Sequence, residues 1–234
     1  MLKDVEKALK KDGKRIKKKL KKEMATRCIH RHTKQTHPNC FRRGLLKKLR
    51  WYDEQKLTIA FLDIETTGLK ANIGFMLSWS LKYRGGPLKS AVVTRKEIFD
   101  GKYDKRITKE LMDELRNVDI VATYYGTGFD IKYLRSRTLY WGFLFPAYGS
   151  VYHFDVYYRV RSLLKLHRNS LDAATRFLGI EGKTPIDISV WNAAQYGKPM
   201  ALKKVLEHND ADVIILEKLF DKLEDYSKWT RKSL

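Results

Sequence analysis

The sequence predicts an α/β domain built on a mixed five-stranded sheet flanked by helices. Short apolar runs rich in β-branched and aromatic residues alternate with segments of helical period. Two of these runs are joined by a Gly-Gly-Pro turn, which makes the two strands antiparallel. A helical crossover leads to the next strand, which favours a parallel pairing with the first. A sheet with both kinds of neighbour, covered by helices, follows from this order.

The first strand is expected in the stretch LTIAFLDIETTGL, which covers residues 57–69. Its apolar run is short and stops at Thr-Thr-Gly, as in a buried strand that ends in a turn. The elements expected after it are strands at 75–83 and 88–95, a helix at 108–118 with Thr108 as N-cap, a strand at 119–125, a helix at 129–142, a strand at 151–156, and helices that start at Ser170, Ile188 and Pro199.

Length and composition bound the kind of protein. The 234 residues suffice for one large domain or a domain with a small appendage, and 43% hydrophobic residues support a core. No apolar run reaches 18 residues, so no membrane span is expected, and the Lys-rich start lacks the apolar segment of a secretory signal. Two cysteines do not suggest a disulfide scaffold. We therefore expect an intracellular, cytoplasmic protein, in the host cytoplasm if the source is viral.

The positive charge is concentrated at the N-terminus. Of the net charge of +21, residues 1–50 carry +15, from 19 Lys and Arg against 4 Asp and Glu. Clustered charge of this size is typical of nucleic-acid binding, with an anionic membrane as the lesser alternative and a solvated helix or tail as the plain one. We expect a basic N-terminal arm at 1–52 and the main domain at 53–234.

The N-terminal arm contains a short tract rich in cysteine and histidine. Zinc prefers four tetrahedral nitrogen and sulfur ligands, and such tracts often bind it. The alternative is two free thiols and scattered histidines on a basic loop, because the spacing matches no standard zinc finger. The candidate ligands are Cys28, His32, His37 and Cys40, with His30 as the alternative to one histidine.

Two carboxylates at the end of the first strand are the strongest chemical signal. Asp63 and Glu65 are two residues apart, and side chains alternate along a strand, so both face the same side. Adjacent carboxylates repel each other and are costly to desolvate. A divalent cation removes both costs, because hard cations prefer oxygen ligands. The spacing therefore predicts a metal site.

Distant segments supply further acidic residues. Asp130 follows a Gly-Thr-Gly turn after the fourth strand, although an Asp there is more often a helix N-cap. Asp212 lies in an apolar stretch, where an unpaired buried Asp is rare. His208 precedes it by four residues, so the two share a helix face. Asp155 and Asp172 are assigned only to helix starts.

Three motifs in this chain resemble those of the DEDD proofreading-type 3′–5′ exonucleases, which have a ribonuclease-H-like fold. They are LDIETTGL at 62–69, YYGTGFDIKYL at 124–134 and HNDAD at 208–212. The segment HFDVYYRVRSLLKLHRNSLDAATRFLGI at 153–180 is also similar to the proofreading domain of family-B DNA polymerases, and to stand-alone ribonuclease-H-like exonucleases. The resemblance covers residues 57–222.

The resemblance implies a site in which four carboxylates hold two Mg²⁺ or Mn²⁺ ions. These would be Asp63, Glu65, Asp130 and Asp212, with His208 as the base that deprotonates the attacking water. The resemblance also implies contacts to the terminal nucleotide from Thr66, Leu69 and Phe129, although core packing is an equally plain role for Leu69 and Phe129.

The third motif departs from the two common patterns of the family. One has Tyr with three residues before the Asp, and the other has His with four. This chain has His with three, which changes the direction of the side chain by about 100°. His208 therefore combines the tyrosine spacing with histidine chemistry.

The expected function is a metal-dependent 3′–5′ exonuclease that favours single-stranded DNA, with nucleic acid as partner. Two alternatives stay open: an RNase or structure-selective endonuclease on the same fold, and a catalytically inactive nucleic-acid-binding protein. The expected cofactors are two Mg²⁺ or Mn²⁺ ions and one structural Zn²⁺ in the arm.

Overall fold

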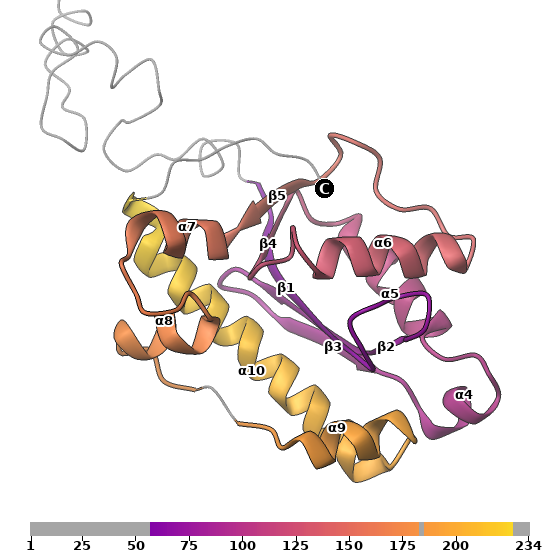
Figure 1. Ribbon diagram of the computed structural model, residues 1–234. Coiled ribbons are helices and arrows are strands. Elements are labelled where there is room, and N and C mark those ends of the chain that lie inside the picture. The colour runs from indigo at the N-terminus through magenta and orange to yellow at the C-terminus, as the bar shows by residue number, and fades with distance from the viewer. Residues whose placement is uncertain (1–56, 183–184, 227–234) are drawn as a thin grey trace, which may run out of the picture. The chain divides into compact units, whose positions relative to one another are not determined.

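The computed structural model describes residues 57–182 and 185–226. Its described part contains one five-stranded sheet in the order β3-β2-β1-β4-β5 (Figure 1). β1 pairs with β2, and β2 with β3, in antiparallel fashion, whereas β1–β4 and β4–β5 are parallel. The mixed α/β sheet predicted from the sequence is therefore confirmed. The strands are β1 (Ile59–Thr66), β2 (Met76–Tyr83), β3 (Leu88–Val92), β4 (Ile120–Thr123) and β5 (Tyr152–Asp155).

Helices occupy the connections and the C-terminal part of the domain. Their predicted starts near Ser170, Ile188 and Pro199 are confirmed: Ser170 caps α8 through a bond from the amide of Ala173, and Pro199 opens α10. The helices are α4 (Arg95–Phe99), α5 (Lys105–Leu115), α6 (Asp130–Tyr140), α7 (Val156–Leu163), α8 (Leu171–Phe177), α9 (Ile188–Gln195) and α10 (Pro199–Leu223), followed by a 3₁₀ turn at Glu224–Tyr226.

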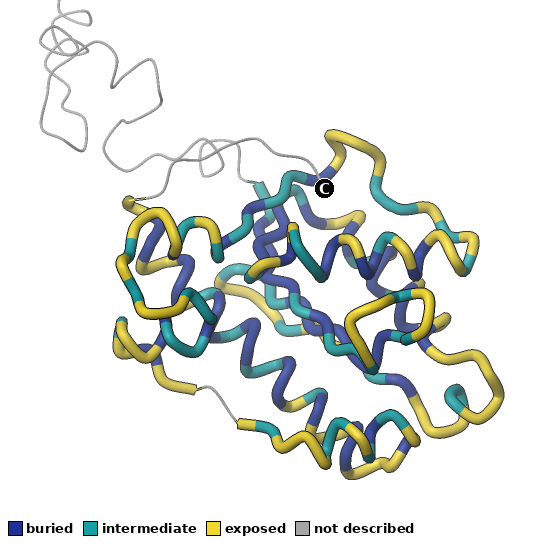
Figure 2. The backbone as a smooth tube through the Cα atoms, viewed as in Figure 1, coloured by how far each residue is buried: buried dark blue, intermediate teal, exposed yellow. Residues whose placement is uncertain are grey.

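The two faces of the sheet are covered by different helices. Helix α10 packs on β1, β2 and β3, while α5 and α6 lie together on the other side (Figure 1). Alternate side chains of β1 pack on opposite faces of the sheet. Phe61 meets Phe220 of α10 edge-on at 5.3 Å, while the next residue, Leu62, is buried on the other face. Strands β1, β2 and β4 are largely buried, β3 and β5 are less so, and the connecting loops are mostly exposed (Figure 2).

Two element boundaries predicted from the sequence are wrong. The third strand ends at Val92 rather than at 95, because Thr94 and Glu97 form a capping box that starts the short helix α4. The next helix begins at Lys105, so Thr108 is a buried residue inside it rather than its N-cap. Asp104 holds the N-cap position but its side chain makes no capping bond.

The carboxylate of Asp104 is used instead in a buried ion pair. Arg137 of α6 donates to it from Nε (2.8 Å) and Nη2 (2.7 Å), and Trp141 Nε1 donates at 2.8 Å. The backbone amide of Met76 adds a fourth bond at 2.9 Å. Asp104 is fully buried, so these bonds replace its lost hydration and tie the start of α5 to α6 and β2.

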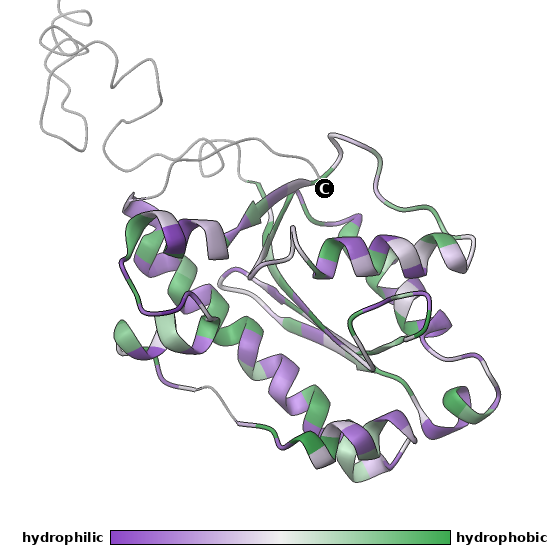
Figure 3. Ribbon diagram, in the orientation of Figure 1, coloured by the Kyte–Doolittle hydropathy of each residue, from purple (hydrophilic) through white to green (hydrophobic). Residues whose placement is uncertain are grey.

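Within the described ranges, none of the helices is both long enough and apolar enough to cross a membrane. The longest, α10, carries polar and apolar residues mixed along its length (Figure 3).

Candidate active site

The two carboxylates of β1 face the same helix, as their spacing predicts. Asn209 of α10 donates a hydrogen bond from Nδ2 to Oδ2 of Asp63 at 2.6 Å. Two residues further along β1, Oε1 of Glu65 lies 3.8 Å from Nε2 of His208, also on α10. The strand pairing shifts register between Glu65 and Thr66, so the regular strand ends where this acidic pair ends.

Helix α10 brings His208 and Asp212 to this face of the sheet. Both side chains are buried, and Nε2 of His208 lies 4.0 Å from Oδ2 of Asp212. The four-residue spacing thus places the two groups together, as expected for one helix face. The ring of Trp191 from α9 meets the imidazole edge-on at 6.1 Å, which makes one wall of the surroundings apolar.

Asp130, the first residue of α6, reaches β1 from a different direction. Its Oδ1 accepts a hydrogen bond from the backbone amide of Ile64 at 3.2 Å, and Ile64 stands between Asp63 and Glu65 in the chain. Burial raises the pKa of the Asp130 carboxyl to about 7, and the negative charge of Asp155 adds to the rise, while bonds from the amides of Ile64 and of Asp130 itself oppose it. Asp130 therefore lies beside the acidic pair.

Asp155, at the end of β5, holds the loop that leads to Asp130. Its carboxylate caps α7 through the amide of Tyr157 (3.1 Å), as predicted. It also accepts bonds from the backbone amides of Tyr125 and Thr127, each at 2.9 Å. Tyr125 has φ 65°, a left-handed conformation that is rare outside glycine. Asp155 thus has a larger positioning role than the sequence suggested.

The acidic residues lie on adjoining elements but do not yet converge. Over residues 57–182 and 185–226, no group of three His, Cys, Asp or Glu side chains is arranged to hold a metal ion. All four carboxylate ligands predicted from the sequence, and His208, nevertheless connect to β1 or to α10 beside it. The structure brings the residues to one region of the sheet without forming a finished coordination shell.

The three residues expected to contact a nucleotide differ in their surroundings. Oγ1 of Thr66 donates to the carbonyl of Gly68 at 2.9 Å. Leu69 is 80% exposed, so core packing does not explain it. Phe129 is half-buried, and its ring lies 5.5 Å from that of Tyr133.

Sequence reasoning missed two polar residues of α10, Asn209 and Asp210. Oγ of Ser80, which pairs with Asp63 across β1 and β2, donates to Oδ1 of Asp210 at 2.6 Å. Consecutive residues of one helix turn, 208 to 210, therefore each contact a different residue of β1 or β2. Both residues lie inside the motif HNDAD at 208–212, but the resemblance gives a role only to His208 and Asp212.

Several predictions fall on residues that the structure does not describe. The basic arm at 1–52, its boundary with the main domain, and the candidate zinc ligands all lie outside the described residues. Those ligands are Cys28, His30, His32, His37 and Cys40.

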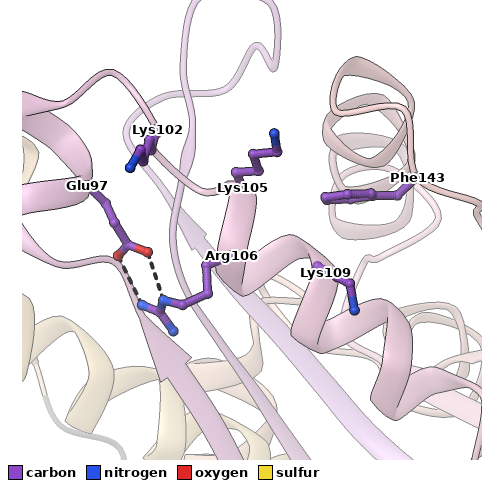
Figure 4. Close-up of a pocket in the computed structure, with 6 residues that line it drawn as sticks. All are labelled: Glu97, Lys102, Lys105, Arg106, Lys109 and Phe143. Carbon is purple, nitrogen blue, oxygen red and sulfur yellow. Dashed lines mark hydrogen bonds and ion pairs between the residues drawn. The ribbon is translucent and has the colours of Figure 1, made fainter.

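A basic pocket of about 250 Å³ lies on the surface of α4 and α5, but it contains no candidate site residue (Figure 4). Its lining includes Lys102, Lys105, Lys109 and Phe143. Its one acidic residue, Glu97, is bound by Arg106 at 2.7 Å. This pocket therefore offers no acidic donor set for a cation.

Comparison with known protein families decides where this chain belongs. Residues 60–224 match the model of a family described as RNase H superfamily. The chain belongs to the RNase H superfamily. A search of curated proteins found no match. Among solved structures, the chain is similar to a family B DNA polymerase from the hyperthermophilic archaeon Pyrobaculum calidifontis, with a TM-score of 0.59 and 18% identity. The similarity covers 72% of this chain and 24% of the polymerase chain, and at this identity it shows the fold.

Membership in the RNase H superfamily confirms the fold class and the resemblance inferred from the three motifs. It supports nuclease activity in general, with nucleic acid as the substrate. RNase H-like nucleases generally use divalent metal ions such as Mg²⁺. The all-oxygen donor set beside β1 is of the kind that Mg²⁺ prefers.

Proposed function

We propose that this RNase H-like chain is a metal-dependent 3′–5′ exonuclease that favours single-stranded DNA. The observation that carries the proposal is that acidic residues of three separate elements lie in one region of the sheet. Asp63 and Glu65 come from β1, Asp130 from α6 and Asp212 from α10, with His208 3.8 Å from Glu65 and 4.0 Å from Asp212. A purely structural site would have no need for this concentration of buried and half-buried negative charge.

The side chains fit a divalent cation by their chemistry. Asp130 and Asp212 are buried, Asp63 and Glu65 are half-buried, and all four offer carboxylate oxygens. Their present arrangement does not form a shell of three ligands within the described ranges, so ion binding requires side-chain movement. Two bound ions would activate a water and stabilise the leaving 3′ oxygen.

His208 is proposed as the general base. Its Nε2 lies between the carboxylates of Glu65 and Asp212. Histidine is the side chain best suited to take a proton from a water near neutral pH. Trp191 shields one side of the ring. Thr66, Leu69 and Phe129 are proposed to contact the terminal nucleotide; the exposure of Leu69 leaves its side chain accessible to a substrate.

The preference for DNA and the role of the N-terminal arm are parts of the proposal. The concentrated positive charge of residues 1–50 would hold a nucleic acid by releasing counterions. We also propose that Cys28, His32 or His30, His37 and Cys40 bind one structural Zn²⁺ in this arm, and that Mn²⁺ can replace Mg²⁺ in the main site. A cytoplasmic location remains part of the same proposal.

Two other functions compete with this one. The first is an RNase or structure-selective endonuclease, because a fold does not fix the reaction it supports. The second is an inactive nucleic-acid-binding protein, which the retained acidic residues argue against.

One assay separates the three functions. Purified protein is incubated with 3′-labelled and 5′-labelled single-stranded and double-stranded DNA and RNA, with Mg²⁺, Mn²⁺ or EDTA. Stepwise release of mononucleotides from 3′ ends of DNA, abolished by EDTA, is the result expected. Internal cuts or a preference for RNA would favour the first alternative, and binding without cleavage under any metal would favour the second.

A further inference from the structure

Asn209 is a fully buried amide between two candidate site residues of the same helix. It is 0% exposed, directly follows His208, and donates to Oδ2 of Asp63 at 2.6 Å. The contact joins residues 146 positions apart in the chain, so it depends on the tertiary fold. It places an uncharged donor against one oxygen of a proposed metal ligand.

The other end of this amide carries a cost. A carboxylate only accepts hydrogen bonds, so the NH₂ group of Asn209 must face Asp63 and its Oδ1 must point elsewhere. That Oδ1 is buried, and within the described ranges it accepts no hydrogen bond. Leaving a buried acceptor without a donor destabilises the folded state, a cost that a leucine of similar size would avoid. The fold therefore keeps a polar residue here although half of its amide group is unsatisfied.

A neutral amide at position 209 is compatible with cation binding by the carboxylate of Asp63. A lysine or arginine at position 209 would also hold Asp63, but its charge would oppose a divalent ion. A neutral N–H donor fixes the carboxylate and leaves its negative charge available. Groups that hold ligands in this way typically change metal affinity by 10–100-fold when they are removed.

We propose that Asn209 is a positioning residue that orients Asp63 for metal binding. The inference rests on the proposed function, because it assumes that Asp63 is a metal ligand. Ser80 provides a matched control, since its hydroxyl bonds to Asp210, the next residue of the same helix turn, while only Asn209 donates its side-chain amide to Asp63.

The experiment compares full-length wild type with Asn209→Leu and Ser80→Ala. Mn²⁺ affinity is measured by titration calorimetry, kcat and KM by release from 3′-labelled single-stranded DNA, and stability by thermal unfolding in EDTA. Asn209→Leu should weaken Mn²⁺ binding about tenfold or more and lower kcat, while KM for DNA stays unchanged and the metal-free protein stays folded. Ser80→Ala should lower the melting temperature and leave Mn²⁺ affinity unchanged.

The outcomes separate this inference from the proposed function. Mn²⁺ affinity in Asn209→Leu equal to that of wild type, or an equal loss in Ser80→Ala, would overturn the positioning role. If wild type itself neither binds Mn²⁺ nor cleaves DNA, the proposed function fails, and the proposal that Asn209 orients Asp63 for metal binding fails with it. In that case the carboxyl ¹³C chemical shift of Asp63 is measured in metal-free protein. A chemical shift that Asn209→Leu leaves unchanged would show that Asn209 does not orient the Asp63 side chain.

Discussion

The carboxylate of Asp155 accepts a hydrogen bond from the backbone amide of Tyr125, a residue with φ 65°. This bond and its partner from Thr127 fix the loop between β4 and the first residue of α6, Asp130. A strained backbone persists only where its surroundings hold it, and such places are often functional.

Replacing Tyr125 by glycine should therefore cost the fold little. The left-handed conformation costs a non-glycine residue about 1–2 kcal/mol, which offsets the lost contact of its half-exposed ring with Tyr157. We expect the free energy of unfolding, measured in urea, to change by less than about 1 kcal/mol. The control is Tyr124→Gly, which removes a ring whose hydroxyl bonds to the carbonyl of Asn169 and should cost at least about 2 kcal/mol. Equal losses at both positions would contradict the assignment of strain to Tyr125.

Replacing Asp130 by asparagine should separate activity from stability. Asparagine keeps an oxygen to accept the bond from the amide of Ile64 and removes a buried negative charge. We expect metal-dependent cleavage to fall by at least about 10²-fold, while the melting temperature in EDTA stays equal or rises. Activity close to wild type in Asp130→Asn would remove this residue from the proposed metal ligands.

Replacing His208 by alanine should affect turnover more than ion binding. A general base contributes about 10²–10⁴-fold to a rate, so kcat should fall within that range. Mn²⁺ affinity should fall far less than kcat, because His208 is not proposed as a ligand. The exposed His167 is the matched control, and its alanine variant should behave as wild type. Unchanged turnover in His208→Ala would end its role in the mechanism.

Replacing Asp104 by alanine should strongly destabilise the domain. The change leaves the buried guanidinium of Arg137 without its carboxylate, which typically costs about 3–5 kcal/mol. The surface pair of Lys109 and Asp113, also at 2.7 Å, provides the comparison, and Asp113→Ala should destabilise the domain far less, because water screens an exposed pair. Chemical denaturation measures both. A small loss for Asp104→Ala would show that the buried pair contributes little to stability.

Much of the fold could be predicted because its strands and helices have strong local signals. The apolar run of β1, the Gly-Gly-Pro turn and the amphipathic period of α5 each identify an element from neighbouring residues alone. The start of α5 is predicted at Thr108, whereas Asp104 holds the N-cap position. The local sequence does not show that the Asp104 carboxylate binds Arg137, 33 residues away, instead of capping the helix.

The site was partly predictable for the same reason. The shared face of Asp63 and Glu65 follows from strand alternation, and that of His208 and Asp212 from the helical period. Asn209 and Asp210 could not be found, because their partners lie on β1 and β2, 146 and 130 residues away in the chain. No local pattern indicates which polar residue of a helix turn will meet a strand so distant.

The length of α10 makes the two sides of the candidate site, α10 and the loop after β1, respond differently to a ligand. The helix that carries His208 and Asp212 also buries Val205, Leu216 and Phe220 in the core. Its central backbone amides should therefore exchange for deuterium only when the whole domain unfolds. Leu69, by contrast, stands 80% exposed beyond the end of β1, on a loop that can exchange locally. When a nucleic-acid strand binds, we therefore expect the loop that carries Leu69 to change conformation while the backbone of α10 stays in place.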